Sequence, residues 1–146
     1  MVDKETLDFV YDNCPCINLR KATRTTTRYF EEQLLSMDIS VNNLIFLIVI
    51  GREDGVTQKQ LAELLALHQS TLSRTIKDVQ NKGWIKSEWT QENSKRVKKF
   101  TLSEGGMQKV EEATPVWVEG YQAFLENNSQ EEWTSTLDRL NKIKFD

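Results

Sequence analysis

The sequence predicts one mainly α-helical domain with a small β-hairpin. Apolar side chains recur at helical spacing through much of the 146-residue chain, and two capping boxes mark helix starts. Two β-prone runs, residues 84–90 and 96–102, flank the polar segment 91–95 and predict the hairpin. The composition, with 38% hydrophobic and 28% charged residues, suits a single folded core.

A long helix with a short one upstream, followed by a further helix, is expected in the first 52 residues. Residues 17–37 contain no Gly or Pro, which predicts a long helix, extended upstream by a short one around residues 7–11. Ser40 is placed to cap a second helix from Val41 to about Arg52, ended by Gly51 or Gly55. The β-branched residues in this second segment suit a buried strand equally, so periodicity leaves helix and strand open there.

The centre of the chain predicts two short helices joined by a tight turn. Thr57 and Gln60 form a capping box at the start of the first helix. After a break at residues 66–68, the second helix runs over residues 69–82 and is closed by Gly83. At about 100° per residue this helix has an apolar face and an opposite polar face. The apolar face holds Leu72, Ile76 and Val79, and the polar face holds Ser70, Arg74, Lys77 and Asn81.

The C-terminal part predicts two more helices. Gly105 and Gly106 interrupt the chain before a helix over about residues 107–125, which is bent or entered near Pro115. Residues 129–132 form the second capping box and open a final helix. The apolar stripe of that final helix consists of Trp133, Leu137, Leu140 and Ile143.

The charge is distributed unevenly along the chain. Residues 69–100 hold eight Lys or Arg against three acids, a net charge of +5, whereas the rest of the chain carries −8. A basic stretch in an acidic protein is typical of a face that binds a polyanion. A merely solvated charged surface is the alternative that charge alone leaves open.

Several functional classes are excluded by the sequence. The longest apolar run, residues 44–50, is far shorter than the roughly 20 residues of a membrane span, and no signal peptide is present, so we expect a cytoplasmic protein without membrane contact. No nucleophile elbow, P-loop or zinc-protease motif occurs, which argues against an enzyme. One His and two Cys are too few for a zinc site, and no cofactor is expected. Trp84 and Trp89 are expected to pack in the fold and not to stack on bases.

The two short helices followed by a basic hairpin form a helix-turn-helix with a wing. At this point the sequence resembles the MarR (multiple antibiotic resistance regulator) family in four successive motifs. They are LAELL at 61–65, STLSR at 70–74, VQNKGWI at 79–85 and LSEGG at 102–106. The resemblance implies a winged helix over about residues 40–104, with dimerisation helices over about 1–37 and 107–146. It further implies a homodimeric transcriptional regulator, usually a repressor, that binds double-stranded DNA. A small ligand or oxidation lowers the affinity of such a regulator for DNA.

The recognition helix and the wing supply the expected DNA contacts. Arg96 matches the family's wing arginine, but Ser94 stands where the family has the Asp that holds it, and His68 stands where a capping side chain is usual. Short hydroxyls at a helix N-terminus suit phosphates and base edges, as do basic side chains. The candidate DNA-binding residues are Ser70, Thr71, Ser73, Arg74, Lys77, Lys95, Arg96 and Lys98.

Two further hypotheses concern regulation. Phe30 and Trp117 are candidates for lining the cavity in which the family binds small, often aromatic, ligands, although core packing is the alternative for both. Cys16 falls where the peroxide-sensing branch of the family has its reactive cysteine, so a redox-sensing repressor using Cys16, with Cys14 nearby, is one alternative. Two small buried side chains near an interface are the structural alternative for these cysteines. A winged helix used only for protein contact is the remaining alternative function.

Overall fold

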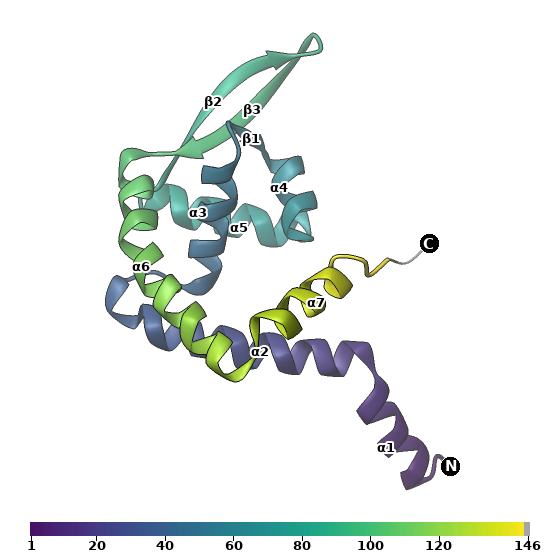
Figure 1. Cartoon of the computed structure of the whole chain (residues 1–146). Helices are drawn as coiled ribbons and strands as arrows, with labels where there is room; N and C mark the ends of the chain where they lie inside the picture. The colour runs from purple at the N-terminus through teal and green to yellow at the C-terminus, as the bar shows by residue number, and fades with distance from the viewer. Residues whose placement is uncertain (145–146) are drawn as a thin grey trace.

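The computed structural model describes residues 1–144, which form seven α-helices, one short 3-10 helix and three strands. The hairpin extends away from the helices at one end of the molecule, and the two N-terminal helices lie at the opposite end (Figure 1). The mainly α-helical class with a small β-hairpin is confirmed. Residues 145–146, which belong to the expected C-terminal dimerisation region, lie outside the described residues. The elements are α1 (Lys4–Asn13), α2 (Pro15–Leu34), η1 (Leu35–Met37), α3 (Val41–Arg52), β1 (Val56–Thr57), α4 (Gln58–Leu65), α5 (Gln69–Asn81), β2 (Ile85–Glu92), β3 (Lys95–Leu102), α6 (Glu104–Asn127) and α7 (Gln130–Leu140).

Helix α3 lies in the centre of the core. The Ser40 Oγ accepts a hydrogen bond from the Asn43 amide at 3.1 Å, so the expected N-cap is formed. The segment is a helix and not the buried strand that its β-branched residues also suited. Its buried side chains recur at helical spacing. They are Asn43, Leu44, Phe46, Leu47 and Ile50.

Helix α3 ends at Arg52 as expected, but of the two glycines expected to end it, Gly51 does not. The helix continues through Gly51 to Arg52, and the Leu102 side chain fills the space beside the glycine. A Cβ at position 51 would lie 2.7 Å from the Leu102 Cδ1, so this glycine allows close packing. The reversal comes at Gly55, whose φ of +85° lies in the left-handed region.

Helices α4 and α5 form the expected helix-turn-helix. Thr57 Oγ1 accepts from the Gln60 amide at 3.2 Å, and Gln60 Oε1 accepts from the Thr57 amide at 2.9 Å, which completes the capping box. Ala66 ends α4 in the left-handed conformation, with a φ of +49°. The two helices contribute to the core through Leu61, Leu72, Ile76 and Val79.

The hairpin is longer and its turn tighter than expected. Strands β2 and β3 pair in antiparallel register up to Glu92 and Lys95, so only two residues of the polar segment 91–95 connect them. Asn93 and Ser94 form a two-residue turn with φ values of +48° and +63°, which is the backbone of a type I′ turn. A third, two-residue strand that the sequence did not predict, β1, pairs with β3 through Val56 and Phe100. The sheet order is β1-β3-β2.

Helix α6 begins earlier than expected and includes both glycines. Ser103 Oγ accepts from the Gly106 amide at 3.0 Å and caps the helix, which then runs from Glu104 to Asn127. Gly105 and Gly106 therefore do not precede the helix. Gly106 is required because its α-carbon lies against the backbone of Trp84, where an added Cβ would be 1.9 Å from the carbonyl oxygen. Pro115 lies inside the helix.

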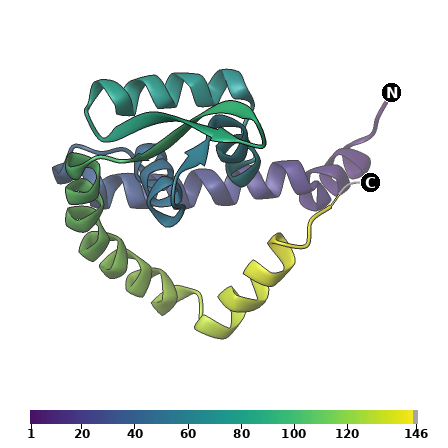
Figure 2. The same ribbon diagram turned by 90° about the horizontal axis from the view of Figure 1, so that it is seen from above.

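The terminal helices pack on one another and leave apolar side chains exposed. The short upstream helix is α1, capped by Asp3, and the long one is α2 followed by η1. Gly120 of α6 lies against the ring of Phe30 on α2, which brings these two helices together. Helix α7 begins after Ser129 and stands away from the winged-helix region, toward the side where α1 lies (Figure 2). It ends at Leu140, before Ile143.

Within residues 1–144, no single helix has both the length and the apolar character of a membrane span. The segments Pro15–Met37 and Val41–Arg52 meet these criteria only as a pair, and the chain bends by 84° between them.

Candidate nucleic-acid interface

Helix α5 has the two faces that its sequence predicts. Leu72 and Val79 are fully buried, and Ile76 is 6% exposed. The expected polar face is exposed, and neither Arg74 nor Lys77 forms an ion pair with any residue in the range 1–144. The outer face of α5 therefore presents two cations without a neutralising partner.

The N-terminal end of α5 carries three hydroxyls in different situations. Ser70 and Thr71 are exposed, and the N-cap residue His68 makes no side-chain capping hydrogen bond. Ser73 Oγ instead donates to the Gln69 carbonyl and accepts from Gln58 Nε2, both at 2.8 Å. The Ser73 hydroxyl thus connects α4 to α5, and its capacity for a DNA contact is reduced to one lone pair.

Strand β3 of the wing carries three exposed cations without ion pairs among the described residues, namely Lys95, Arg96 and Lys98. The fourth, Lys99, is paired with Glu92 on the neighbouring strand and is half-buried. Arg96 lies opposite Gln91 in the register, and Lys98 lies opposite Trp89. The hairpin therefore presents cations along its returning strand, as the sequence indicated.

The two tryptophans of this region differ. Trp84 is buried, with the ammonium groups of Lys82 and Lys109 4.9 and 5.8 Å from its ring centroid. Trp89 is 57% exposed, so it is not a core residue, and the expectation that it does not stack on bases stays a prediction. The Arg96 guanidinium carbon is 4.8 Å from its ring centroid. Its neighbourhood depends on the hairpin register, which the sequence alone did not fix.

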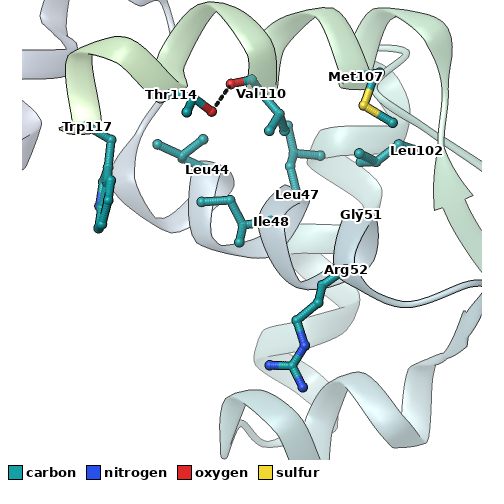
Figure 3. Close-up of a pocket in the computed structure, with 10 residues that line it drawn as sticks. All are labelled: Leu44, Leu47, Ile48, Gly51, Arg52, Leu102, Met107, Val110, Thr114 and Trp117. Carbon is teal, nitrogen blue, oxygen red and sulfur yellow. Dashed lines mark hydrogen bonds between the residues drawn. The ribbon is translucent and has the colours of Figure 1, made fainter. Parts of the chain in front are cut away.

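A cavity of about 440 Å³ lies between α3 and α6 (Figure 3). Its walls are almost entirely apolar, and the Thr114 hydroxyl in its wall donates to the Val110 carbonyl at 2.7 Å. Arg52 is the one charged residue in this lining within the described chain, and its guanidinium points away from the apolar side chains. The other lining residues are Leu44, Leu47, Ile48, Gly51, Leu102, Met107 and Trp117.

The two predicted ligand residues are placed differently. Trp117 lines this cavity, whereas Phe30 lines an adjoining hollow of about 190 Å³ that shares Leu44, Ile48 and Trp117 with it. The rings of Phe30 and Trp117 are stacked, with centroids 6.4 Å apart. Sequence reasoning missed the lining residues of α3 because a uniformly apolar helix gives no sign of which side faces a cavity. The cation Arg52 at the end of that helix was the only available signal.

The cysteines are both free thiols. Cys16 is exposed and Cys14 is half-buried in the single chain. The hypothesis that both are buried near an interface stays a prediction. Both precede or begin α2, where Pro15 occupies the first helical position. Exposure makes Cys16 accessible to solvent without assigning it a chemical role.

Comparison with known proteins agrees with this architecture. The MarR family model matches residues 37–96. The HTH-type transcriptional regulator BilQ of Clostridium symbiosum is 25% identical over 121 residues, which cover 81% of this chain and 83% of BilQ. A mutant MarR of E. coli in complex with operator DNA has a TM-score of 0.77 at 22% identity, covering 91% of this chain and 95% of that one. BpsR of Bordetella bronchiseptica, whose DNA binding is regulated by 6-hydroxynicotinic acid, has a TM-score of 0.77 at 16% identity, covering 90% and 94%.

The elements and their order form a winged helix with an exposed basic face. The region matched by the family model contains the complete helix-turn-helix and both strands of the wing up to Arg96. Residues 37–96 resemble the MarR family in sequence, and the chain shares the fold of a MarR structure.

Proposed function

We propose that this protein is a homodimeric repressor that binds a palindromic operator through α5 and the wing. The observation that carries the proposal is the set of cations on these two elements that have no acidic partner in the described chain. Cations without an acidic partner can replace the counterions of DNA phosphates. The proposed contacts are Ser70, Thr71, Arg74 and Lys77 on α5 and Lys95, Arg96 and Lys98 on the wing, with Ser73 in a supporting position.

Arg74 is the residue we assign to base recognition. It lies on the exposed face of the helix that enters the major groove in winged-helix proteins, where a guanidinium donates two hydrogen bonds to guanine. Arg96 and Lys98 are assigned to the phosphate backbone or a narrow minor groove. Binding through a base contact depends on the DNA sequence, whereas binding through a phosphate contact depends on the salt concentration. Titrations that vary both can therefore distinguish the two roles.

The decisive experiment begins with selection of bound sequences from random duplexes, followed by titrations at two salt concentrations. Arg74→Ala should weaken binding to the selected site by roughly 1–3 kcal/mol and relax selectivity at one position. Lys98→Ala should weaken all duplexes alike and reduce the salt slope by about one unit. Arg28→Ala removes an exposed cation from α2 and serves as the control. Unchanged affinity for Arg74→Ala would contradict the assignment of α5 as the recognition helix.

Dimerisation is proposed from apolar side chains exposed at both ends of the chain. Leu7 and Phe9 of α1 are 57% and 67% exposed, and Leu137 of α7 is 40% exposed. Helix α1 and the C-terminal end of α7 lie toward the same side of the molecule (Figure 2). A second copy that covers this side would bury these side chains, and a two-fold axis would place two copies of α5 about 34–36 Å apart on DNA. Light scattering at micromolar concentration should give twice the mass of the chain, and a monomer would refute this part.

Ligand control is proposed for the cavity between α3 and α6. Its apolar walls suit an aromatic ring. Arg52 at its edge points away from the walls (Figure 3) and lies 3.4 Å from Glu53, so it would have to leave Glu53 and turn inward to bind a carboxylate substituent. Such a ligand lowers DNA affinity only if it binds the DNA-incompetent arrangement more tightly. Calorimetry should detect benzoate binding more tightly than the neutral benzyl alcohol, and Arg52→Gln should remove that difference. Equal binding of the two compounds would contradict the role of Arg52, and binding of neither would contradict the site.

A further inference from the structure

The wing arginine meets an aromatic ring where a carboxylate would be expected. The guanidinium carbon of Arg96 lies 4.8 Å from the centroid of the Trp89 ring, inside the range of cation–π contact. No carboxylate of residues 1–144 lies within ion-pair distance of Arg96. Trp89 itself is 57% exposed, so its ring is not explained by burial in the core.

The register of the hairpin explains this pairing. Trp89 pairs with Lys98, and Gln91 pairs with Arg96, so Trp89 and Arg96 are diagonal neighbours on one face of the ribbon. The direct partner, Lys98, places its ammonium over Phe100 instead, 5.6 Å from that ring centroid. The face of Trp89 is therefore taken by the arginine.

An aromatic ring orients a guanidinium differently from a carboxylate. A carboxylate neutralises the charge and accepts from the edge of the guanidinium, which occupies donors that DNA would use. A ring contacts the flat face, so the cation keeps its charge and its N–H groups at the edge remain available. Because the ring already restricts the arginine side chain in the free protein, that side chain loses less conformational freedom on binding than an unrestricted one.

We propose that Trp89 is a positioning residue of the wing, which holds the Arg96 guanidinium ready for DNA through its indole face. This inference rests on the proposed DNA-binding function, because it assigns Trp89 a role through Arg96 and no contact of its own. The short, type I′ turn at Asn93 and Ser94 keeps the two strands in the register that this contact needs.

The test is a double-mutant cycle on the selected operator duplex, with all four proteins shown to fold by circular dichroism. Trp89→Ala should weaken binding about two- to five-fold, as expected for one exposed cation–π contact. Trp89→Phe should restore most of the affinity because it keeps a ring face. In the Arg96→Ala background, Trp89→Ala should have no further effect.

The matched control is the same cycle with Lys98→Ala, which removes the direct cross-strand partner of Trp89. Here the two effects should multiply, because the Lys98 ammonium lies over the ring of Phe100. A readout without DNA is the upfield ring-current shift of the Arg96 side-chain protons in solution NMR, which Trp89→Ala should abolish and Trp89→Phe should retain.

Multiplicative losses from Trp89→Ala and Arg96→Ala would overturn the inference while leaving the DNA-binding function intact. Equal coupling of Trp89 to Lys98 and to Arg96 would also overturn it, as would the absence of a ring-current shift at Arg96. Failure of the unmodified protein to bind any duplex would instead overturn the proposed function itself.

Discussion

Replacing Gly106 by Ala should destabilise the protein, although alanine is the better helix former. An added Cβ would lie 1.9 Å from the carbonyl oxygen and 2.8 Å from the carbonyl carbon of Trp84. These are backbone atoms, so no side-chain rotation relieves the overlap. The same carbonyl accepts a hydrogen bond from the Ser103 amide at 3.0 Å, which ties the start of α6 to the start of β2.

The magnitude follows from three effects of different sign. Overpacking of this kind costs about 1–3 kcal/mol. Displacing the Trp84 carbonyl from Ser103 adds on the order of 1 kcal/mol. Alanine recovers at most about 1 kcal/mol of helix propensity. We therefore expect Gly106→Ala to lower the free energy of unfolding by roughly 1–3 kcal/mol, with the overlap as the dominant effect.

The neighbouring glycine provides the control. A Cβ at Gly105 would lie 3.5 Å from the Gly83 carbonyl oxygen, which is an ordinary contact. Gly105→Ala should therefore stabilise the protein by up to about 1 kcal/mol through helix propensity alone. Urea unfolding followed by circular dichroism, at one fixed chain concentration because of the proposed dimer, measures both variants. Equal stability of the two variants would refute the reasoning.

Three other perturbations test separate features. Asn43→Ala should lower the free energy of unfolding by about 1–3 kcal/mol, since the Asn43 amide is buried and donates to Asp78 of α5 at 2.8 Å; chemical denaturation measures it, and an unchanged midpoint would contradict it. Cys16→Ser and the unmodified protein should bind operator equally after peroxide treatment, because no hydrogen bond within residues 1–144 orients the Cys16 thiol. A loss of operator binding in the unmodified protein alone would establish Cys16 as a sensor. The backbone and hydroxyl hydrogen bonds of Thr6 hold the pKa of Asp3 below its usual range. The cap therefore stabilises α1 above the ordinary carboxyl pKa, and this stabilisation is lost as the pH falls below it. Amide exchange at Thr6, corrected for the intrinsic rate, should become faster at low pH, and constant protection would contradict this.

Local signals account for the elements that the sequence predicted well. The caps at Ser40 and Thr57 involve residues within three positions of one another, so their hydrogen bonds can be predicted without knowing the fold. The apolar face of α5 follows equally from helical spacing. Strand β1 could not be predicted in this way, because its two residues are held by Phe100 and Lys99 of a strand far along the chain.

The site was predictable in outline and less so in detail. The exposure of Arg74 follows from its position opposite Leu72 and Ile76 on a helix. The engagement of Ser73 with Gln58 could not be foreseen, because it depends on the angle between two helices. Gly106 resembled a helix breaker for a similar reason, since its partner is the carbonyl of a residue more than twenty positions earlier.

Pro115 divides α6 mechanically. It is the twelfth of 24 residues, and its missing N–H leaves the carbonyl of Glu111 without its partner in the helix ladder. Toward the N-terminal side, Gly106 locks the helix to the backbone near the wing, and toward the C-terminal side Gly120 locks it to α2. Helix α6, which is roughly 36 Å long, is therefore least stiff between these two attachments. Each degree of bending at Pro115 moves one end of the helix by about 0.3 Å. The weak point lies beside Thr114 in the cavity wall, so an occupant of the cavity would press on the part of the helix that yields most easily.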